Sequence, residues 1–257
     1  MTSLSIVTVV RNDAPGLTRT YDSIIKARQS GLLTGVEFEW VVQDGKSSDD
    51  TINQLVRFEG EGLIRILRAS EADSGIYDAM NRAARRANGD RLWFLNGGDE
   101  LNGEGLGDKD VQAFADALRT KQDKTVHVFG FYMVGDARSR RKAPRSGRYL
   151  SHSLPSSHQA LIYPRSAFVA GHYYSTAYKV CGDYAHACSL KMAGYEFQPI
   201  DVAIARFFLG GASTQRREAL LREASAIQKD ILGLSAAYRY WSYMRRYLTM
   251  KLIDALL

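Results

Sequence analysis

Cysteine is scarce in this chain, which removes a disulfide framework from consideration. Only Cys181 and Cys188 occur among 257 residues. The segment around them has helical spacing, and seven residues along one helix separate two side chains by roughly 10 Å, too far for a disulfide. We therefore expect two free thiols and a reducing compartment, which means a cytoplasmic protein.

Long hydrophobic runs are also missing. No window approaches the ~18 apolar residues that a membrane-spanning helix needs. The opening segment MTSLSIVTVVRND has no basic residues ahead of its short apolar run, so we expect a first strand there and no signal peptide. With 45% apolar and 24% charged residues, the composition is that of an ordinary globular protein with one large domain, or one domain and an appended segment.

Two common ligand signatures are absent as well. The loop after the first predicted strand reads RNDAPGL and lacks the G-x-G-x-x-G pattern of dinucleotide-binding folds. The five histidines are scattered and show no zinc spacing. The net charge of +6 favours an anionic partner, which leaves nucleic acid, anionic lipid and a phosphorylated substrate open.

What is present is a regular alternation in the first hundred residues. Apolar, β-branched runs predict strands at 4–10, 38–44, 63–69 and 91–96. Segments with helical spacing lie between them, at 16–30, from 47 onward, and at 76–88. Strands separated by helices indicate βαβ units and a parallel sheet.

The remainder of the chain has a different character. Extended patterns recur at 126–135, 157–164 and 196–207, with a helical pattern at 182–195 and proline-free helix from 214 to the end. Six basic residues fall between Arg138 and Arg148. Such a run is usually a solvated loop. Because aromatic residues are not interleaved with it, a phosphate-rich lipid head group suits it better than stacked bases.

The last helix is amphipathic in sequence. One side carries Arg239, Ser242, Arg245, Arg246 and Thr249. Another side carries Tyr238, Trp241, Met244, Leu248 and Leu252. Basic and aromatic residues together are typical of a helix at a membrane interface. Packing on the domain is the alternative.

Polar residues follow each of the four predicted strands of the first half. They are Arg11 to Asp13, Asp44 and Gly45, Glu71 to Gly75, and Asn96 to Asp99. Ligands of open α/β sheets lie beyond the carboxyl ends of the strands, so this pattern predicts one shared site. Ordinary turns would explain any single one of them.

Several residues carry a chemical expectation of their own. Asp99 is the candidate for a hard cation such as Mg²⁺ or Mn²⁺, with glycines at 97 and 98 letting a diphosphate approach the backbone. Asp183, at the start of a helix, is either an N-cap or a general base. Asp78 and Asn81 share one helix face and either cap the helix or contact a sugar.

In their order along the chain, these motifs resemble family 2 glycosyltransferases. The matching stretches are SIVTVVRN, EWVVQDGKSSDDT, SEADSGIYDAMN, GDRLWFLNGGDEL, SSHQALIY, CGDYAHA and FFLGGAS. The resemblance covers roughly residues 4 to 215. The tract YLSHSLPSSHQA followed by AYKVCGDYA is similar to the glycosyltransferases of colanic acid and other exopolysaccharide biosynthesis. The resemblance implies the GT-A fold, an α/β architecture with a Rossmann-like, mostly parallel central sheet.

The resemblance also implies roles for individual residues. Nucleoside contacts fall at Thr8, Arg11, Asn12 and Asp44, and contacts near the ribose and donor sugar at Asp73, Gly75, Asp78 and Asn81. Asn96 to Asp99, Gly98 included, occupy the place of the D-x-D metal motif. There Gly97 replaces the first acid, so that Mn²⁺ or Mg²⁺ binding rests on Asp99. Asp183 takes the position of the catalytic base. We place acceptor contacts at His158, Gln159, Arg145 and Arg148.

The function expected from this resemblance is inverting transfer of a hexose from a nucleotide-diphosphate sugar. GDP-fucose and UDP-galactose are the candidate donors. The acceptor is an oligosaccharide on a polyprenyl diphosphate at the inner face of the cytoplasmic membrane, during exopolysaccharide or capsule assembly. We expect a catalytic domain over 1–213, divided near 101 into donor and acceptor halves, and a helical segment over 214–257 that contacts an anionic membrane surface. A non-catalytic nucleotide-sugar-binding module is the alternative. A nucleic-acid-binding protein is a remote one, so no nucleic acid partner is expected.

Overall fold

A mixed sheet forms the centre of the computed structural model, which describes residues 3–120, 123–135, 138–208 and 216–256. Its first half is the predicted parallel sheet. The strands β1 (Ser3–Val10), β2 (Glu37–Asp44), β3 (Arg65–Ser70) and β4 (Arg91–Phe94) lie in the order β3-β2-β1-β4, and all three pairings are parallel. Their carboxyl ends therefore meet at one edge.

Both faces of this sheet are covered, which explains the continuous apolar sequence of β1. Ile6 lies in the core under α1 (Ala14–Gln29), α2 (Thr51–Glu61) and α4 (Asp108–Arg119). Val7 lies in the core on the opposite face, under α3 (Ile76–Arg86) and α6 (Gly182–Met192). Because successive side chains of a strand point to opposite faces, each apolar residue of β1 packs into one core or the other.

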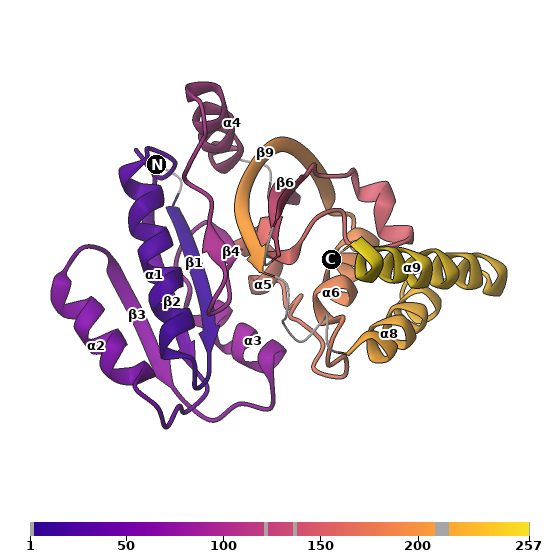
Figure 1. Cartoon of the computed structure of the whole chain (residues 1–257), viewed down its shortest axis with the longest axis horizontal. Helices are drawn as coiled ribbons and strands as arrows, with labels where there is room; N and C mark the ends of the chain where they lie inside the picture. Colours follow the sequence, from indigo (N-terminus) through magenta and orange to yellow (C-terminus); the bar gives the residue numbers. More distant parts are fainter. Residues whose placement is uncertain (1–2, 121–122, 136–137, 209–215, 257) are drawn as a thin grey trace.

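The second half of the sheet is mixed. β8 (Leu161–Pro164) runs antiparallel between β4 and β6 (Thr125–Val134), and β9 (Glu196–Phe208) lies parallel to β6. The short strands β5 (Glu100–Leu101) and β7 (Ser139–Lys142) pair antiparallel with β9 and β6. The register of β6 and β9 shifts around Gly130, where β9 curves strongly (Figure 1).

The structure corrects several expectations in this second half. The predicted strand at 157–164 begins with a 3₁₀ helix, η2 (His158–Ala160), and only β8 is extended. Part of the basic run is the strand β7, not a loop, and a further 3₁₀ helix η1 (Gly147–Ser151) follows it. The helix α4, the short helix α5 (Arg165–Val169) and the strand β5 were not predicted.

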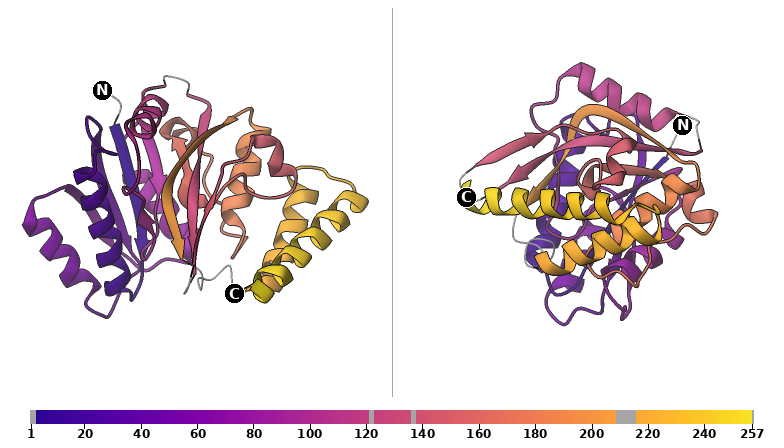
Figure 2. Two further views of the ribbon diagram at one scale, coloured as in Figure 1. Left: turned by 45° about the horizontal axis from the view of Figure 1, so that its top comes forward. Right: turned by 90° about the vertical axis from the view of Figure 1, so that its right-hand side faces the viewer.

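The carboxyl-terminal helices α8 (Arg217–Asp230) and α9 (Ala236–Leu256) lie together at one end of the molecule, far from α1 and α2 (Figures 1 and 2). The helical character expected from 214 onward is confirmed for the described part. The boundary predicted at 213/214, and the glycines of the FFLGGAS motif, lie outside the described residues.

The predicted polar side of α9 faces inward at two positions, which corrects the amphipathic interpretation. Ser242 is fully buried and its Oγ lies 2.7 Å from His152 Nδ1, while Gln228 Nε2 of α8 donates to the same Oγ at 2.8 Å. Arg246 is also buried and its guanidinium lies over the ring of Tyr184 on α6. This part of α9 therefore packs on the domain, which is the alternative to membrane contact that the sequence left open.

The two cysteines are free, as expected, and the structure shows that both are buried. Cys188 lies within α6, whereas Cys181 is the N-cap residue that precedes it.

Candidate active site

A cleft of about 1110 Å³ lies beyond the carboxyl end of β4. On one side it is lined by the turn after β4, by η2 and by the start of α6. On the other side it is lined by residues 140–145, which we call the basic side, together with Tyr149. Of the predicted site residues, the cleft brings together Asn96, Gly98, Asp99, Arg145, His158, Gln159 and Asp183.

Hydrogen bonds with Thr20 of α1 fix the main chain of the turn at Asn96 to Asp99. The Thr20 hydroxyl donates to the main-chain oxygen of Asp99 at 2.8 Å and accepts from the N–H of Gly98 at 3.1 Å. Gly98 has φ +92°, a conformation that favours glycine. The flexible-looking sequence NGGD therefore folds into a pinned turn, and Asp99 is fixed at its end.

Burial shifts the pKa of Asp99. Removal from water raises the pKa of its carboxyl to about 7, and a hydrogen bond of 2.7 Å from Gln159 Nε2 to Oδ2 opposes that rise. Such a carboxyl changes charge near neutral pH. It gains its full charge most readily beside a cation, which is consistent with the predicted metal role.

The described residues contain no group of three or more His, Cys, Asp or Glu side chains arranged to hold a metal ion. A site that depends on phosphate oxygens does not need one. Beside the Asp99 carboxylate, Asn96 Oδ1 is a buried oxygen that no described residue contacts with a hydrogen bond. The two oxygen-bearing side chains of one turn suit a hard cation, so the residues present fit Mn²⁺ or Mg²⁺ when a diphosphate completes the shell.

Asp183 lies in the first turn of α6 and lines the cleft half-buried. Burial raises the pKa of its carboxyl, and the nearby His158 acts in the opposite direction. The N-cap position of α6 is occupied by Cys181, which makes no side-chain cap hydrogen bond. Asp183 Oδ1 accepts from the first-turn N–H of Tyr184 at 2.7 Å, so the carboxylate also stabilises the start of the helix.

His158 is neutral in this setting, because burial lowers the pKa of its ring. Its Nε2 lies 3.2 Å from Asn96 Nδ2. The ring lines the cleft near Asp183, and its contact with Asn96 places it beside the turn that follows β4.

The residues predicted for the nucleoside gather beside the cleft, at the ends of β1 and β2. Asn12 has φ +50°; its N–H donates to Ser47 Oγ and its Oδ1 accepts from the N–H of Ser48, both at 2.8 Å. Asp44 is fully buried and accepts from Ser70 Oγ at 2.5 Å. A Cβ on Gly45 would lie 2.7 Å from Asp73 and 3.2 Å from Arg11, so these side chains converge on a glycine.

Two other predicted contacts, Thr8 and Asn81, are engaged by the protein itself. Thr8 is fully buried, donates to the main-chain oxygen of Leu95 at 2.7 Å and accepts from Trp40 Nε1 at 2.8 Å. Asn81 is buried and forms two hydrogen bonds of 2.8 Å with the main chain of Tyr174. These contacts give both side chains a structural role, and neither lines the cleft.

Asp78 and Gly75 belong to the turn that starts α3. Asp78 Oδ2 accepts from the N–H of Ser74 at 3.0 Å and pairs with Arg82, which lowers the pKa of the carboxyl. These contacts correspond to the first of the two roles considered for Asp78, stabilising the start of the helix, and not to the sugar contact. Gly75 has φ +129° and lies just before α3. Arg148 is exposed in η1 and does not line the cleft.

The basic side carries charge that the protein does not neutralise. Among the described residues, no acid lies within 4.0 Å of Arg140, Lys142 or Arg145, whereas Arg141 pairs with Asp201 at 2.6 Å. Burial and the neighbouring Arg140 and Arg145 lower the pKa of Lys142. The sequence pattern did not reveal the aromatic partner of Arg145, whose guanidinium lies 4.0 Å from the centre of the Tyr149 ring.

Other cleft residues were missed because their sequence signals are those of core or strand. Phe131, Met133, Phe207 and Phe208 line the cleft from β6 and β9, and Tyr77 from α3. They are half-buried, apart from the buried Tyr77. The β6 residues fall in the part of that strand that pairs with β7, so the apolar wall and the basic side are built together.

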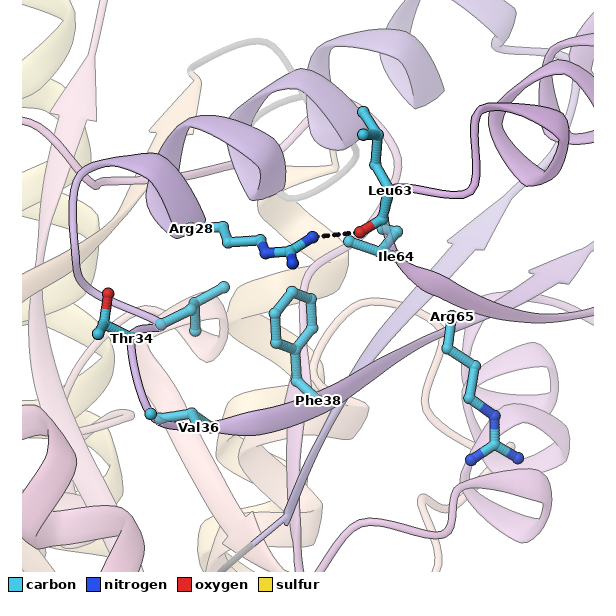
Figure 3. A pocket seen from close by; sticks show the side chains of 9 residues that line it. Arg28, Thr34, Val36, Phe38, Leu63, Ile64 and Arg65 are labelled. Carbon is cyan, nitrogen blue, oxygen red and sulfur yellow. Dashed lines mark hydrogen bonds between the residues drawn. The ribbon is translucent and has the colours of Figure 1, made fainter.

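A second cavity, of about 440 Å³, lies near the amino-terminal ends of β2 and β3, at the opposite edge of the sheet (Figure 3). Phe38 and Ile64 line it together with two arginines. Arg28 donates to the main-chain oxygen of Leu63, and Arg65 lies 3.7 Å from Glu39. Both cations are already engaged, in contrast to those of the basic side.

Comparison with known proteins agrees with this geometry. Residues 5–173 match the family model described as glycosyl transferase family 2. An uncharacterized glycosyltransferase of Mycobacterium tuberculosis is 34% identical over 168 residues, which are 64% of this chain and 59% of that protein. A PGL/p-HBAD biosynthesis glycosyltransferase of Mycobacterium bovis is 30% identical over 180 residues, 70% of this chain and 66% of that protein. The match thus spans about three fifths to two thirds of these relatives.

Solved structures share the architecture. S. aureus TarS in complex with UDP-GlcNAc superposes with a TM-score of 0.62 at 17% identity, over 94% of this chain and 70% of that chain. The mannosyltransferase PcManGT from Pyrobaculum calidifontis, in complex with GDP-Man and Mn²⁺, gives a TM-score of 0.62 at 15% identity, over 98% and 86%. The predicted GT-A fold is confirmed. This chain belongs to glycosyl transferase family 2.

Proposed function

We propose that this chain transfers a hexose, with inversion, from a nucleoside diphosphate donor to a hydroxyl of a lipid-linked oligosaccharide. One observation carries the proposal. A carboxylate suited to a cation, Asp99, and a carboxylate suited to a base, Asp183, line the same cleft, whose far side is basic and apolar. Donor and acceptor chemistry thus meet in one cavity.

The donor end is the group of residues at the ends of β1 and β2. Arg11, Asn12, Asp44 and Asp73 supply a guanidinium, an amide and two carboxylates beside the cleft. Relatives of the fold bind UDP-GlcNAc and GDP-Man, so either kind of base suits the architecture. GDP-fucose and UDP-galactose remain our candidate donors. Gly98 and Asn96 lie where the diphosphate would approach the turn.

A divalent cation, when bound, supplies positive charge that stabilises the departing diphosphate. Asp99 and Asn96 are the residues that would hold Mn²⁺ or Mg²⁺. Asp183 accepts the proton of the acceptor hydroxyl, whose oxygen forms a bond to the anomeric carbon while the bond from that carbon to the diphosphate breaks. Burial raises the pKa of Asp183 toward neutral pH, which makes it a better proton acceptor than an exposed aspartate.

The acceptor end is the basic side. Lys142 and Arg145 are free of described ion pairs, and Phe131 and Phe207 lie on the adjoining wall. An anionic and apolar group meets both requirements, as a polyprenyl diphosphate does. The resemblance to exopolysaccharide enzymes points to a growing oligosaccharide on that carrier, in capsule or colanic acid-type assembly.

The exposed face of α9 supports a peripheral location at the inner membrane surface. Tyr240, Trp241 and Leu248 are 69%, 48% and 55% exposed, and Arg245 and Lys251 are exposed beside them. Aromatic and basic side chains on one exposed helix suit an anionic membrane interface. No helix within the described ranges is long and apolar enough to cross a bilayer.

Deletion of α9 is a poor test of this location, because it would also remove the packing of Ser242 and Arg246. The double variant Tyr240→Glu with Leu248→Glu changes the exposed face alone. Loss of sedimentation with phosphatidylglycerol vesicles is expected, and unchanged sedimentation would refute the membrane contact. Val56→Glu with Val169→Glu is the matched control, because these exposed apolar side chains (50% and 71%) lie on α2 and α5.

Thermal unfolding with UDP, GDP and dTDP, each with and without Mn²⁺, tests the donor site. A ligand at a hundred times its Kd adds about 2.7 kcal/mol to stability, which at this size raises Tm by about 5 °C or more. A metal-dependent shift with one nucleotide supports the proposal. Binding without donor hydrolysis or transfer to any acceptor would favour a non-catalytic module, and salt-sensitive DNA or RNA binding without any nucleotide effect would overturn the donor site.

A further inference from the structure

The 3₁₀ helix η2 lies close to both candidate functional carboxylates of the cleft. Its Gln159 hydrogen-bonds to Asp99, and its His158 lies near Asp183. The main chain of η2 is fixed to the sheet, because Trp93 Nε1 of β4 donates to the main-chain oxygen of Gln159 at 2.6 Å. Trp93 is fully buried and Gln159 is 4% exposed. The position of this turn relative to β4, and so to the Asn96 to Asp99 turn that follows β4, is set within the core.

Both polar atoms of the Gln159 side chain are engaged. The Ser157 hydroxyl donates to Oε1, and Nε2 donates to Asp99 Oδ2 at 2.7 Å. Because the ionised Asp99 carboxylate can only accept, the NH₂ group of Gln159 is the one that faces it, which leaves Oε1 for the Ser157 hydroxyl. The amide therefore presents a donor to the carboxylate. Its oxygen and its NH₂ group each already have a protein partner and the residue is 4% exposed, which argues against the acceptor role that we assigned to Gln159.

The main chain and the side chain of Asp99 are held by different residues. Thr20 fixes the main-chain oxygen, as described above, and this contact leaves rotation of the carboxylate free. Gln159 supplies the contact to Oδ2, so Oδ1 is the oxygen that Gln159 leaves for another partner. A ligating carboxylate is commonly oriented in this way by a hydrogen-bonding neighbour.

We propose that Gln159 is a positioning residue for the metal carboxylate. By donating to Oδ2 of Asp99, it would hold the carboxylate in one orientation and leave Oδ1 as the oxygen available to a bound cation. This role rests on the proposed function, since it requires Asp99 to bind the metal. It compensates in part for Gly97, which stands where the resemblance places a first acid: a single carboxylate with a fixed orientation replaces a pair.

Gln159→Met tests the role, because methionine fills a similar volume and cannot donate. We would measure the Kd of Mn²⁺ by the electron paramagnetic resonance signal of free Mn²⁺, with saturating UDP and, separately, GDP. Loss of such an orienting partner typically weakens metal binding by about 10- to 100-fold, and that range is the expected result. Binding of the nucleotide without metal should stay unchanged.

Gln228→Met is the matched control. Gln228 is also a buried glutamine whose Nε2 donates hydrogen bonds, to the main-chain oxygen of Ser151 and to Ser242 Oγ, but it lies under α9 outside the cleft. It should lose stability and keep the Mn²⁺ Kd of the unaltered chain. If Gln159→Met does not fold, Ser157→Ala carries the test: with Oε1 released, Mn²⁺ binding should weaken at least about threefold.

The outcomes separate this inference from the proposed function. An unaltered chain that binds neither nucleotide nor Mn²⁺ contradicts the proposed function itself. A Gln159→Met variant with the Mn²⁺ Kd of the unaltered chain overturns the positioning role alone. A variant with unchanged Mn²⁺ binding and a raised KM for the acceptor returns Gln159 to the acceptor site, and so also overturns it.

Discussion

Two regions of the site, the strand ends beside the cleft and the basic side of the cleft itself, differ in how far the protein satisfies its own polar groups. At the strand ends of the first half, Asn12, Asp44 and Asp78 hydrogen-bond to neighbouring loops and turns. On the basic side, no described acid pairs with Lys142 or Arg145. The first region is organised before any ligand arrives. The second is electrostatically incomplete, and an anionic partner would stabilise it.

The largest expected effect is a loss of transfer activity in Asp183→Asn, which would show whether the two regions form one active site. Asp183→Asn keeps the shape of this cleft residue and removes the base. Transfer should fall by about 10²- to 10⁴-fold, the usual contribution of a general base. Nucleotide affinity, measured by calorimetry, should not change. Near-normal transfer would remove Asp183 from the mechanism.

A substitution at Thr8 of β1 tests whether the polar residues at the strand ends stabilise the fold or bind the ligand. Thr8→Val leaves Trp40 Nε1 and the main-chain oxygen of Leu95 without their buried partner. Such losses cost about 1–3 kcal/mol each, so the Tm in a thermal scan should fall by several degrees. An unchanged nucleotide Kd would confirm the structural role. A strongly weakened Kd at full stability would instead restore the predicted nucleoside contact.

Charge reversal on the basic side should have a smaller effect than Thr8→Val, and it should change acceptor binding instead of stability. Lys142→Glu places an acid among Arg140 and Arg145, which relieves their repulsion and removes attraction for an anionic acceptor. We expect a KM for a lipid diphosphate acceptor raised about tenfold, or about 1.4 kcal/mol, with little loss of Tm. Donor hydrolysis in the absence of acceptor should be unaffected. An unchanged acceptor KM would place the acceptor elsewhere.

The smallest effect concerns pH. The pKa of Asp99 rises from 3.8 to about 7 on folding, so between these values the folded chain holds a proton that the unfolded chain has lost. Stability from this group is therefore greatest below pH 4 and is lost as pH rises through 7. Between pH 5 and 8 the Tm of the ligand-free chain should fall by a few degrees more than that of Asp99→Asn, and Mn²⁺ with nucleotide should reverse this difference. Parallel pH profiles for the two chains would contradict the shift.

The same contrast explains what the sequence revealed. The strands β1, β2 and β4 are largely buried and contain apolar runs, so they were predicted close to their true positions. The strand β7 has the sequence SRRK, with no apolar periodicity, and is a strand only because β6 pairs with it. Its extended conformation depends on a tertiary contact, which the local sequence does not indicate.

Site residues follow the same rule. Asn96 and Asp99 come from one turn, and their association was visible in the sequence. The contact between Asp99 and Gln159 joins residues 60 positions apart and depends on β8 lying beside β4. The inward face of α9 was misjudged for a related reason: Ser242 and Arg246 look like solvent-facing residues until His152, Gln228 and Tyr184 provide their partners.

The packing of Arg246 on Tyr184 has an evolutionary consequence. Tyr184 directly follows Asp183, and its hydroxyl is tied to the main-chain oxygen of Leu150 at 2.6 Å. A nonsense mutation or a recombination breakpoint ahead of residue 236 would therefore strip a neighbour from the helix that bears the base, together with any membrane contact. Substitutions at Arg246 on the inward face of α9 should therefore be constrained by Tyr184 of α6, whereas those on the outward face are constrained only by the proposed membrane contact.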